Sequence, residues 1–239
     1  MRWKWTALCL FLISSSHASV SGGLTHPGQK AFAQGEGADQ AKDYKTAFNW
    51  YLKAAKLGHA QAQFYLGTMY EYGSATKQDY SQALHWYLQA AEQGYAAAQN
   101  RLGLMYNFGR GVKQDYKQAL SWYQKAAQQG FARAQNHLGA MYHFGRGVKQ
   151  DHNQAVYWYR KAAQQGNVLA QDNLGMKYFR GEGVAKNNIQ AYIWCGVAAM
   201  GGDDMAFFHR YTIGKHLSAT ELKEAQVEIG KRYNRIYRK

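Results

Sequence analysis

The chain has 239 residues, enough for one or two ordinary domains or for one array of small repeating units. It is 46% hydrophobic and contains one proline, so it can bury a core, and this composition excludes an intrinsically disordered chain. Its formal net charge of +14 favours an anionic partner but identifies none.

Residues 1–18 are typical of a signal peptide. Two basic residues precede an apolar run from Trp5 to Ile13, and small residues at positions 16 and 18 favour cleavage after Ala18. The run is shorter than the roughly 20 residues that cross a bilayer, although an uncleaved anchor is the alternative. We therefore expect a periplasmic or secreted protein with no transmembrane segment after cleavage, and residues 19–25 as a linker.

Cleavage would separate the two cysteines of the chain. Cys9 lies in the signal segment, which leaves Cys195 as the single cysteine of the mature chain. One thiol forms no intrachain disulfide, so we expect packing alone to hold the exported protein together.

Between residues 26 and 202 the sequence repeats itself every 36 residues. Several residue types recur in phase, which chance does not produce. The clearest series are Trp50, Trp86, Trp122, Trp158 and Trp194, and Gly58, Gly94, Gly130, Gly166 and Gly202. The predicted units are a degenerate first copy at 26–58, followed by 59–94, 95–130, 131–166 and 167–202.

Each unit is predicted to form two helices, as residues 95–130 illustrate. Leu102, Met105 and Tyr106 share one face of a first helix. Gly103 lies beside this face, and an interior glycine costs about 1 kcal/mol relative to alanine, so its recurrence indicates close approach of a neighbouring helix. After a glycine-rich loop, Asp115 is the expected N-cap of the second helix. Gln118 is placed to complete a capping box, as are the pairs Asp79–Gln82, Asp151–Gln154 and Asn187–Gln190.

Such a helix pair cannot bury both of its apolar faces alone, whereas stacked copies can, and the stack curves. We therefore predict an all-α fold, a right-handed α-solenoid of about five 36-residue helix-turn-helix repeats with a C-terminal capping helix. The recurrent Trp, Tyr, Leu, Ala and Gly residues are assigned to the core.

The repeat unit resembles a known family. The pattern A-x-x-x-L-G-x-M-Y-x-x-G-x-G-V-x-x-D-x-x-x-A-x-x-W-Y-x-x-A-A-x-x-G is similar to the Sel1-like repeat, a relative of the tetratricopeptide repeat, and covers residues 59–202 as four units. In the degenerate leading unit, Ala31 stands where glycine is expected. The resemblance implies a protein-binding scaffold, because relatives act as adaptors in envelope assembly, in control of cell-wall enzymes or in host-cell interaction.

The C-terminal segment, residues 203–239, departs from the repeat as a solenoid cap must. Ser218 and Glu221 form a capping box that opens a final helix to about Tyr233. Its apolar face is expected to comprise Leu222, Ala225, Val227 and Ile229. The basic tail is either a solvated end or a contact for an anionic surface.

In related repeats the first helix of each pair lines the concave face, and positions not needed for stacking vary between the units here. Asn100 and Asn136 would lie one repeat apart, and paired amides suit the backbone of an extended peptide because each can donate and accept. The alternative is a polar surface without a ligand. The candidate partner-binding residues are Phe64, Glu71, Tyr72, Asn100, Asn107, Phe108, Arg133, Asn136, His143 and Phe144.

A second candidate surface is a basic row along the loop edge. Arg110, Lys113, Arg146 and Lys149 occupy matching places in successive loops. Such a row would suit an anionic glycan, a lipid surface or an acidic protein, and ordinary solubilising charge is the alternative.

No catalytic residue, metal ligand or cofactor is predicted. The histidines are scattered, and HExxH, GxSxG, Walker and paired-cysteine motifs do not occur. Some cysteine-rich relatives are linked to β-lactams, so a cell-wall or β-lactam enzyme is the catalytic alternative, although their paired cysteines are lacking here. Nucleic acid is disfavoured because export is expected and most aromatic residues belong to the core series.

Overall fold

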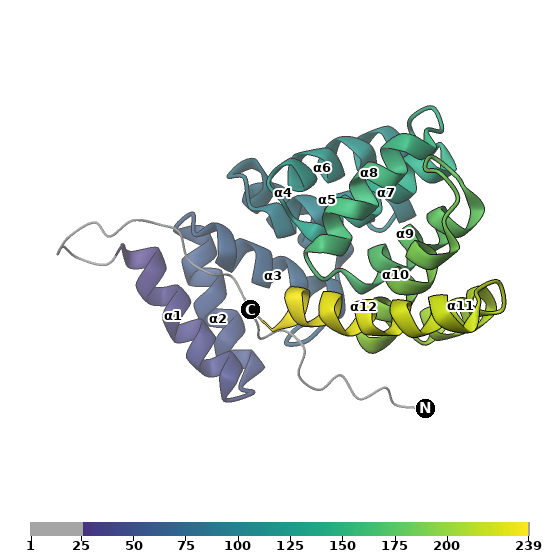
Figure 1. Ribbon diagram of the computed structural model, residues 1–239. Helices are drawn as coiled ribbons and strands as arrows, with labels where there is room; N and C mark the ends of the chain where they lie inside the picture. The colour runs from purple at the N-terminus through teal and green to yellow at the C-terminus, as the bar shows by residue number, and fades with distance from the viewer. Residues whose placement is uncertain (1–25, 239) are drawn as a thin grey trace.

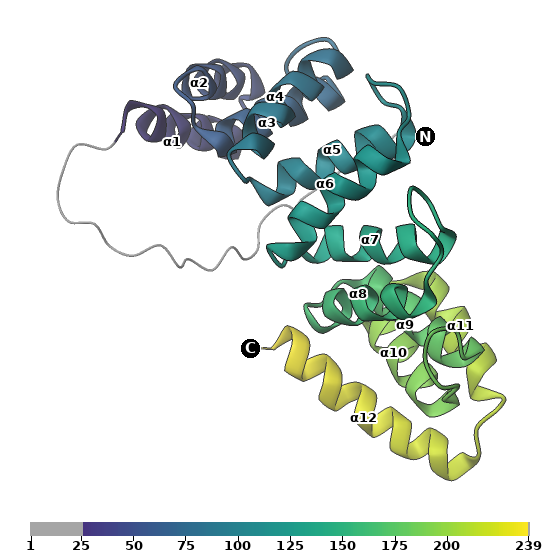
Figure 2. The same cartoon turned by 90° about the horizontal axis from the view of Figure 1, so that it is seen from above.

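The computed structural model describes residues 26–238, which form a curved stack of helix pairs (Figures 1 and 2). The predicted all-α solenoid is confirmed, while the predicted signal peptide and linker lie outside the described residues. The first helices of the five pairs are α1 (Pro27–Gln40), α3 (Ala60–Tyr72), α5 (Ala96–Phe108), α7 (Ala132–Phe144) and α9 (Val168–Arg180). The second helices are α2 (Tyr44–Lys56), α4 (Tyr80–Glu92), α6 (Tyr116–Gln128), α8 (His152–Gln164) and α10 (Asn188–Met200), and α11 (Asp204–Gly214) and α12 (Ala219–Tyr237) follow.

A glycine on each first helix makes room for a side chain of the second helix. A Cβ atom at Gly67 would lie 2.8 Å from Cδ1 of Tyr87, and one at Gly139 would lie 2.7 Å from Cδ1 of Tyr159. Both tyrosines are buried. The close helix approach predicted from Gly103 is therefore present in the second, third and fourth units as a contact between backbone and ring, and in the last unit the Cys195 thiol takes the place of the ring against Gly175.

The first unit meets the same requirement with a glycine that the repeat spacing does not predict. Position 31 was the expected site, but a Cβ atom at Gly35 is the one that would meet Tyr51, at 2.6 Å from its Cδ1. Only residues 41–43 join α1 to α2, whereas residues 73–79 join α3 to α4. The shorter loop moves the glycine four residues along the chain.

The tryptophan series is more exposed than a core assignment predicts. Only Trp194 is buried, and the four earlier tryptophans are half-buried. Trp86, Trp122 and Trp158 each pack against the cluster formed by the second helix of the preceding unit and the first helix of their own, as Trp86 does on the cluster that contains Tyr51 and Leu66. The outer side of several rings carries a cation, for example the Lys125 ammonium, which lies 4.0 Å from the centroid of Trp122.

Helix starts follow the predicted N-caps, with one difference. The Asp115 carboxylate accepts the backbone N–H groups of Lys117 and Gln118 at 2.8 and 3.0 Å. The reciprocal bond that completes a capping box is made by Glu221 to Ser218 and not by the glutamines of the repeats. A carboxylate that accepts two amides already satisfies the first turn, and the neutral glutamine adds little to it.

A second series of contacts ties each unit to its neighbours through buried glutamine. The Gln63 amide donates to the carbonyl oxygen of Ala55 in α2 at 3.2 Å, and its oxygen accepts from Gln93 at 2.7 Å. The same pair of bonds recurs one and two repeats later. In the last repeat the Tyr237 hydroxyl donates to the Gln171 amide oxygen at 3.3 Å. In the last unit Gly201 stands where the earlier units have the donor glutamine, and the cap supplies the hydrogen-bond donor instead.

The cap differs from the predicted helix in extent and in its buried face. α12 continues to Tyr237 instead of ending near position 233. Ala225 and Ile229 are buried as predicted, but Val227 is 55% exposed, because it points away from the α10 contact. α11 precedes it, and there Tyr211 occupies the position that glycine holds in the repeats, and α12 packs mainly against α10.

The glycine contact can be tested with a matched pair of variants. Gly139→Ala should destabilise the fold by about 1–3 kcal/mol, because the new methyl overlaps the buried Tyr159 ring. Gly230→Ala, in α12, should raise stability by about 0.5–1 kcal/mol, because nothing lies within 4 Å of its Cβ position and alanine favours helix. Urea unfolding followed by circular dichroism gives both signs. A neutral or stabilising Gly139→Ala would contradict the packing argument.

Candidate functional site

The first helices present a series of exposed aromatic side chains. α5 and α7 lie on the inner side of the curve and α6 and α8 on its outer side (Figure 1). Tyr72, Phe108 and Phe144 are the last residues of α3, α5 and α7, and they are 56%, 57% and 59% exposed. Each is followed by a glycine in the left-handed conformation, which ends the helix and leaves the ring uncovered.

Arginine side chains lie over these rings. The guanidinium carbon of Arg110 is 5.4 Å from the Phe108 centroid, and that of Arg146 is 5.1 Å from the Phe144 centroid. Arg101 lies 5.6 Å from the Tyr72 centroid and donates to its hydroxyl at 3.0 Å. We name these three rings and three cations the aromatic–arginine row. Cation–π contact helps to hold each guanidinium over its ring.

Glu71 sets the charge at one end of the row. Its carboxylate is buried and accepts a hydrogen bond of 2.7 Å from the Tyr87 hydroxyl. Arg101 and Arg110 lie 3.8 and 4.0 Å from its other oxygen. Burial and this carboxylate both raise the pKa of Tyr87. Glu71 was predicted as a partner-binding residue, but the structure gives it a positioning role behind the arginines.

The predicted pair of free amides is not presented to a ligand. Asn100 and Asn136 are 4% and 7% exposed, and their side-chain oxygens lie 2.9 Å from His137 Nδ1 and 3.2 Å from Asn173 Nδ2. The carboxylate of Asp172 contacts His209 in the same way one repeat later. These positions differ between repeats because each pair is a polar contact between adjacent first helices.

The other predicted residues divide between the surface and the interior. Phe64 is half-buried against the rings of Tyr87 and Tyr95, and Asn107 is buried. Arg133 is exposed on α7. Of the ten candidates, the structure therefore brings only Tyr72, Phe108 and Phe144 together as an exposed set. Sequence reasoning missed Arg101 and His137, although both stand one residue before the Leu-Gly pair, where each repeat carries a different polar residue.

A small apolar cavity opens beside the row, between the third and fourth repeats. Its volume is 150 Å³, and it is lined mainly by side chains of α5 and α7. Phe108 and Arg146 form part of its rim, and Leu104 and Met141 contribute apolar surface. The cavity gives the row a pocket that a single apolar side chain could enter.

The basic loop row predicted from the sequence is divided by the structure. Arg110 and Arg146 turn onto the aromatic rings and belong to the aromatic–arginine row. Lys113 and Lys149 remain exposed on the loops. The loop packs closely against the preceding repeat, since a Cβ atom at Gly111 would lie 2.6 Å from the Tyr80 side chain.

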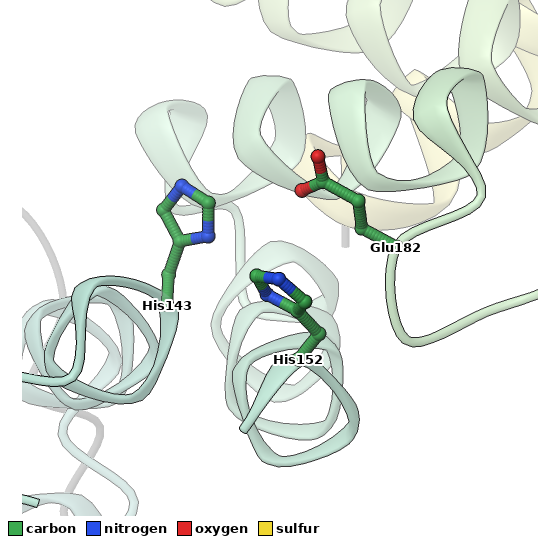
Figure 3. A group of neighbouring side chains, drawn as sticks. All are labelled: His143, His152 and Glu182. Carbon is green, nitrogen blue, oxygen red and sulfur yellow. The ribbon is translucent and has the colours of Figure 1, made fainter. Parts of the chain in front are cut away.

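Two histidines and a glutamate gather where the fourth and fifth repeats meet. Figure 3 shows His143, His152 and Glu182 directed toward one another from α7, α8 and the loop after α9. Their ligand atoms lie within 4.8 Å of one another, as in a metal site. The buried Lys177 ammonium is already among them, 2.6 Å from His143 Nδ1, 3.1 Å from His152 Nδ1 and 2.7 Å from Glu182.

Lys177 therefore supplies the cation of this cluster. All three ammonium protons have acceptors, which satisfies an otherwise costly buried charge. Burial and the ammonium lower the pKa of His143, and the hydrogen bond from Lys177 lowers the pKa of Glu182. His143, predicted to bind a partner, instead joins α7 to α9.

Removing Lys177 should open a metal site. The variant Lys177→Ala leaves the two imidazoles and the carboxylate in place, so calorimetry should detect one Zn²⁺ per chain and metal should raise its melting temperature. The wild type should show neither effect. Lys177→Ala/His152→Ala is the control and should lose the response. Equal Zn²⁺ binding by the wild type would show that the lysine does not block the cluster.

His137 should make stability depend on pH. Burial, followed by repulsion from Arg133 and Arg101, lowers the pKa of His137 to about 4. Because the unfolded side chain takes up a proton near pH 6.5, stability is full above that pH and falls as the pH drops toward 4, by at most about 3 kcal/mol. Urea unfolding at several pH values should show this slope, and His137→Gln should flatten it. An unchanged slope would place the titration elsewhere.

Comparison with known proteins agrees with the repeat architecture. The Sel1 repeat model matches residues 28–59, 60–95, 96–131, 132–167 and 168–203, so the first unit counts as a full repeat. No curated protein matches the chain significantly. None of the helices within residues 26–238 has the length and apolar character needed to cross a membrane.

Several solved structures share the fold. The structure of c5321, a protective antigen of uropathogenic Escherichia coli strains, superposes with a TM-score of 0.83 and 34% identity over 88% of this chain and 46% of the antigen. This chain thus spans about half the length of that relative. A Sel1 repeat protein from Oxalobacter formigenes gives a TM-score of 0.76 and 32% identity over 86% of this chain and 84% of its own. Immunity protein Pa5087 from Pseudomonas aeruginosa, at 22% identity over 87% of this chain and 82% of its own with a TM-score of 0.52, shows the fold alone. The chain belongs to the Sel1 repeat family.

Proposed function

We propose that this Sel1 repeat protein is a non-catalytic scaffold that binds a peptide segment of a partner protein along the aromatic–arginine row. Sel1 repeats mediate protein–protein interaction, which supports the class of function. The observation that carries the finer proposal is that Tyr72, Phe108 and Phe144 recur at one position of successive repeats and are all exposed, whereas the other aromatic residues that recur within residues 26–202 are at least half-covered. Exposed aromatic residues beside arginine are the side chains that dominate binding energy at protein interfaces.

The chemistry of the row defines the partner segment. Three rings offer apolar contact, and the guanidinium edges of Arg110 and Arg146 offer bidentate hydrogen bonds to carboxylates. Packed helices lie roughly 10 Å apart, and an extended chain advances about 3.3 Å per residue, so every third side chain would meet the next ring. An extended segment with an apolar side chain at every third position and acidic side chains between them fits this spacing, with one apolar side chain in the 150 Å³ cavity.

We place this binding outside the cytoplasm, in the periplasm or after secretion. The support is the sequence of residues 1–18, which has the order of charges, apolar run and small residues of a signal peptide. The protective antigen of uropathogenic Escherichia coli, which shares 34% identity, is consistent with an exposed role in a bacterial envelope or at a host.

A peptide selection tests the row directly. A library of random twelve-residue peptides displayed on phage is selected on the purified protein, and we expect enrichment of sequences with Asp or Glu beside aromatic or aliphatic residues. The double variant Phe108→Ala/Phe144→Ala should bind the selected peptides at least about tenfold more weakly with an unchanged melting temperature, because both rings are exposed.

Tyr44→Ala is the matched control, since Tyr44 is an exposed aromatic residue on α2, outside the row. It should bind the selected peptides as the wild type does. Equal binding by Phe108→Ala/Phe144→Ala and the control would move the binding surface away from the row.

A further inference from the structure

We infer that a groove beside the C-terminal cap binds a phosphate group. The groove has a volume of 430 Å³ and is lined by residues of α8, α9, α10 and α12, where α12 packs against α10. Its lining includes Arg160, Arg232, Arg235, Tyr178, Gln190 and Trp194. Most of these residues belong to second helices and the cap, so the groove is separate from the aromatic–arginine row on the first helices.

Two of the three guanidinium groups have no carboxylate partner. Arg160 donates to the neutral Tyr178 hydroxyl at 3.1 Å, which fixes one edge of the side chain and leaves its charge uncompensated. Arg235 is exposed and makes no hydrogen bond or ion pair with the described residues, 26–238. A pair of unneutralised arginines on one groove is an arrangement that repels itself unless an anion is present.

The third guanidinium is held in place by the fold. Arg232 lies 4.6 Å from the centroid of the buried Trp194 ring and donates to the Gln190 amide oxygen at 3.3 Å. It also reaches the Glu228 carboxylate at 3.4 Å. These three contacts orient the guanidinium before any ligand arrives, which reduces the entropy lost on binding.

The repeats themselves show that stacking does not require these arginines. One and two units earlier, the place of Arg160 is held by Gln124 and Leu88. In the unit of Gln124 the cation near the tryptophan comes from the same helix, as Lys125 lies over Trp122, and in the unit of Leu88 that position is Gln89. In the last unit Val197 occupies that position, and the cap supplies Arg232 instead. Arg160 and Arg232 thus both differ from the pattern of the earlier repeats, and both line this groove.

The charge of the groove selects the ligand class. Three guanidinium groups and the Glu228 carboxylate leave an excess of two positive charges. A phosphate monoester carries nearly two negative charges near pH 7, and its oxygens accept the paired N–H groups of arginine in a bidentate manner. A phosphate group therefore neutralises the groove, whereas a single carboxylate leaves one charge unpaired.

Titration calorimetry at low ionic strength tests the site with inorganic phosphate as the probe. The wild type should bind one phosphate per chain, and Arg160→Gln/Arg235→Gln should bind it at least about tenfold more weakly, because it loses two charge-assisted contacts. Lys223→Gln removes an exposed cation elsewhere on α12 and should change affinity less than about twofold. Melting temperatures of all variants establish that the groove variant is folded.

Vesicles distinguish a soluble phosphate from a lipid headgroup. The same proteins are sedimented with phosphatidylcholine vesicles that contain or lack phosphatidic acid. Binding of inorganic phosphate without vesicle binding supports a soluble ligand, and vesicle binding that Arg160→Gln/Arg235→Gln abolishes supports a headgroup. The proposal is overturned if neither probe binds, or if the groove variant and Lys223→Gln bind equally, which would indicate diffuse attraction to a basic protein.

Discussion

The structure depends on the contact between a glycine of each first helix and the side chain that fills it from the second helix. Because Gly139 has no side chain, the Tyr159 ring lies directly on the backbone of α7 and both helices approach closely. In the last unit the same place is taken by Cys195 against Gly175, and burial raises the pKa of that thiol. This approach sets the distance between the two helices of each unit.

The repeat spacing in the sequence was sufficient to predict the helix pairs, the loops and the N-caps, because those features need the same residue at every step of 36. Prediction failed where one repeat differs from the rest. The glycine of the first unit is Gly35 because its loop is shorter, and a strict period points to position 31 instead. Lys177 was missed because its three partners come from three separate segments.

Sequence differences between the repeats predicted the binding site less well than the recurrent residues predicted the helical stack. A position that varies is free of the stacking requirement of the core, but it is not thereby exposed. Asn100 varies because it must match His137 of the next repeat, and Phe108 varies because it contacts little of the protein. From one sequence these two cases look alike, since the contact at a separation of 37 residues has no periodic signature of its own. Only the three-dimensional arrangement distinguishes a polar contact between neighbouring first helices from an exposed binding surface.

The stack thus presents different side chains along its first helices and along its second helices. Three of the first helices, α3, α5 and α7, end in exposed rings, since a left-handed glycine ends each of these three one residue later. The second helices end against the next unit or, at the last unit, against the cap, where Tyr237 makes the contact that a glutamine makes elsewhere. A cap that only closed the stack would need this hydroxyl and an apolar face. Closing the stack does not need the arginines of α12. A separate anionic ligand would explain why Arg232 and Arg235 lie together at the end of the stack.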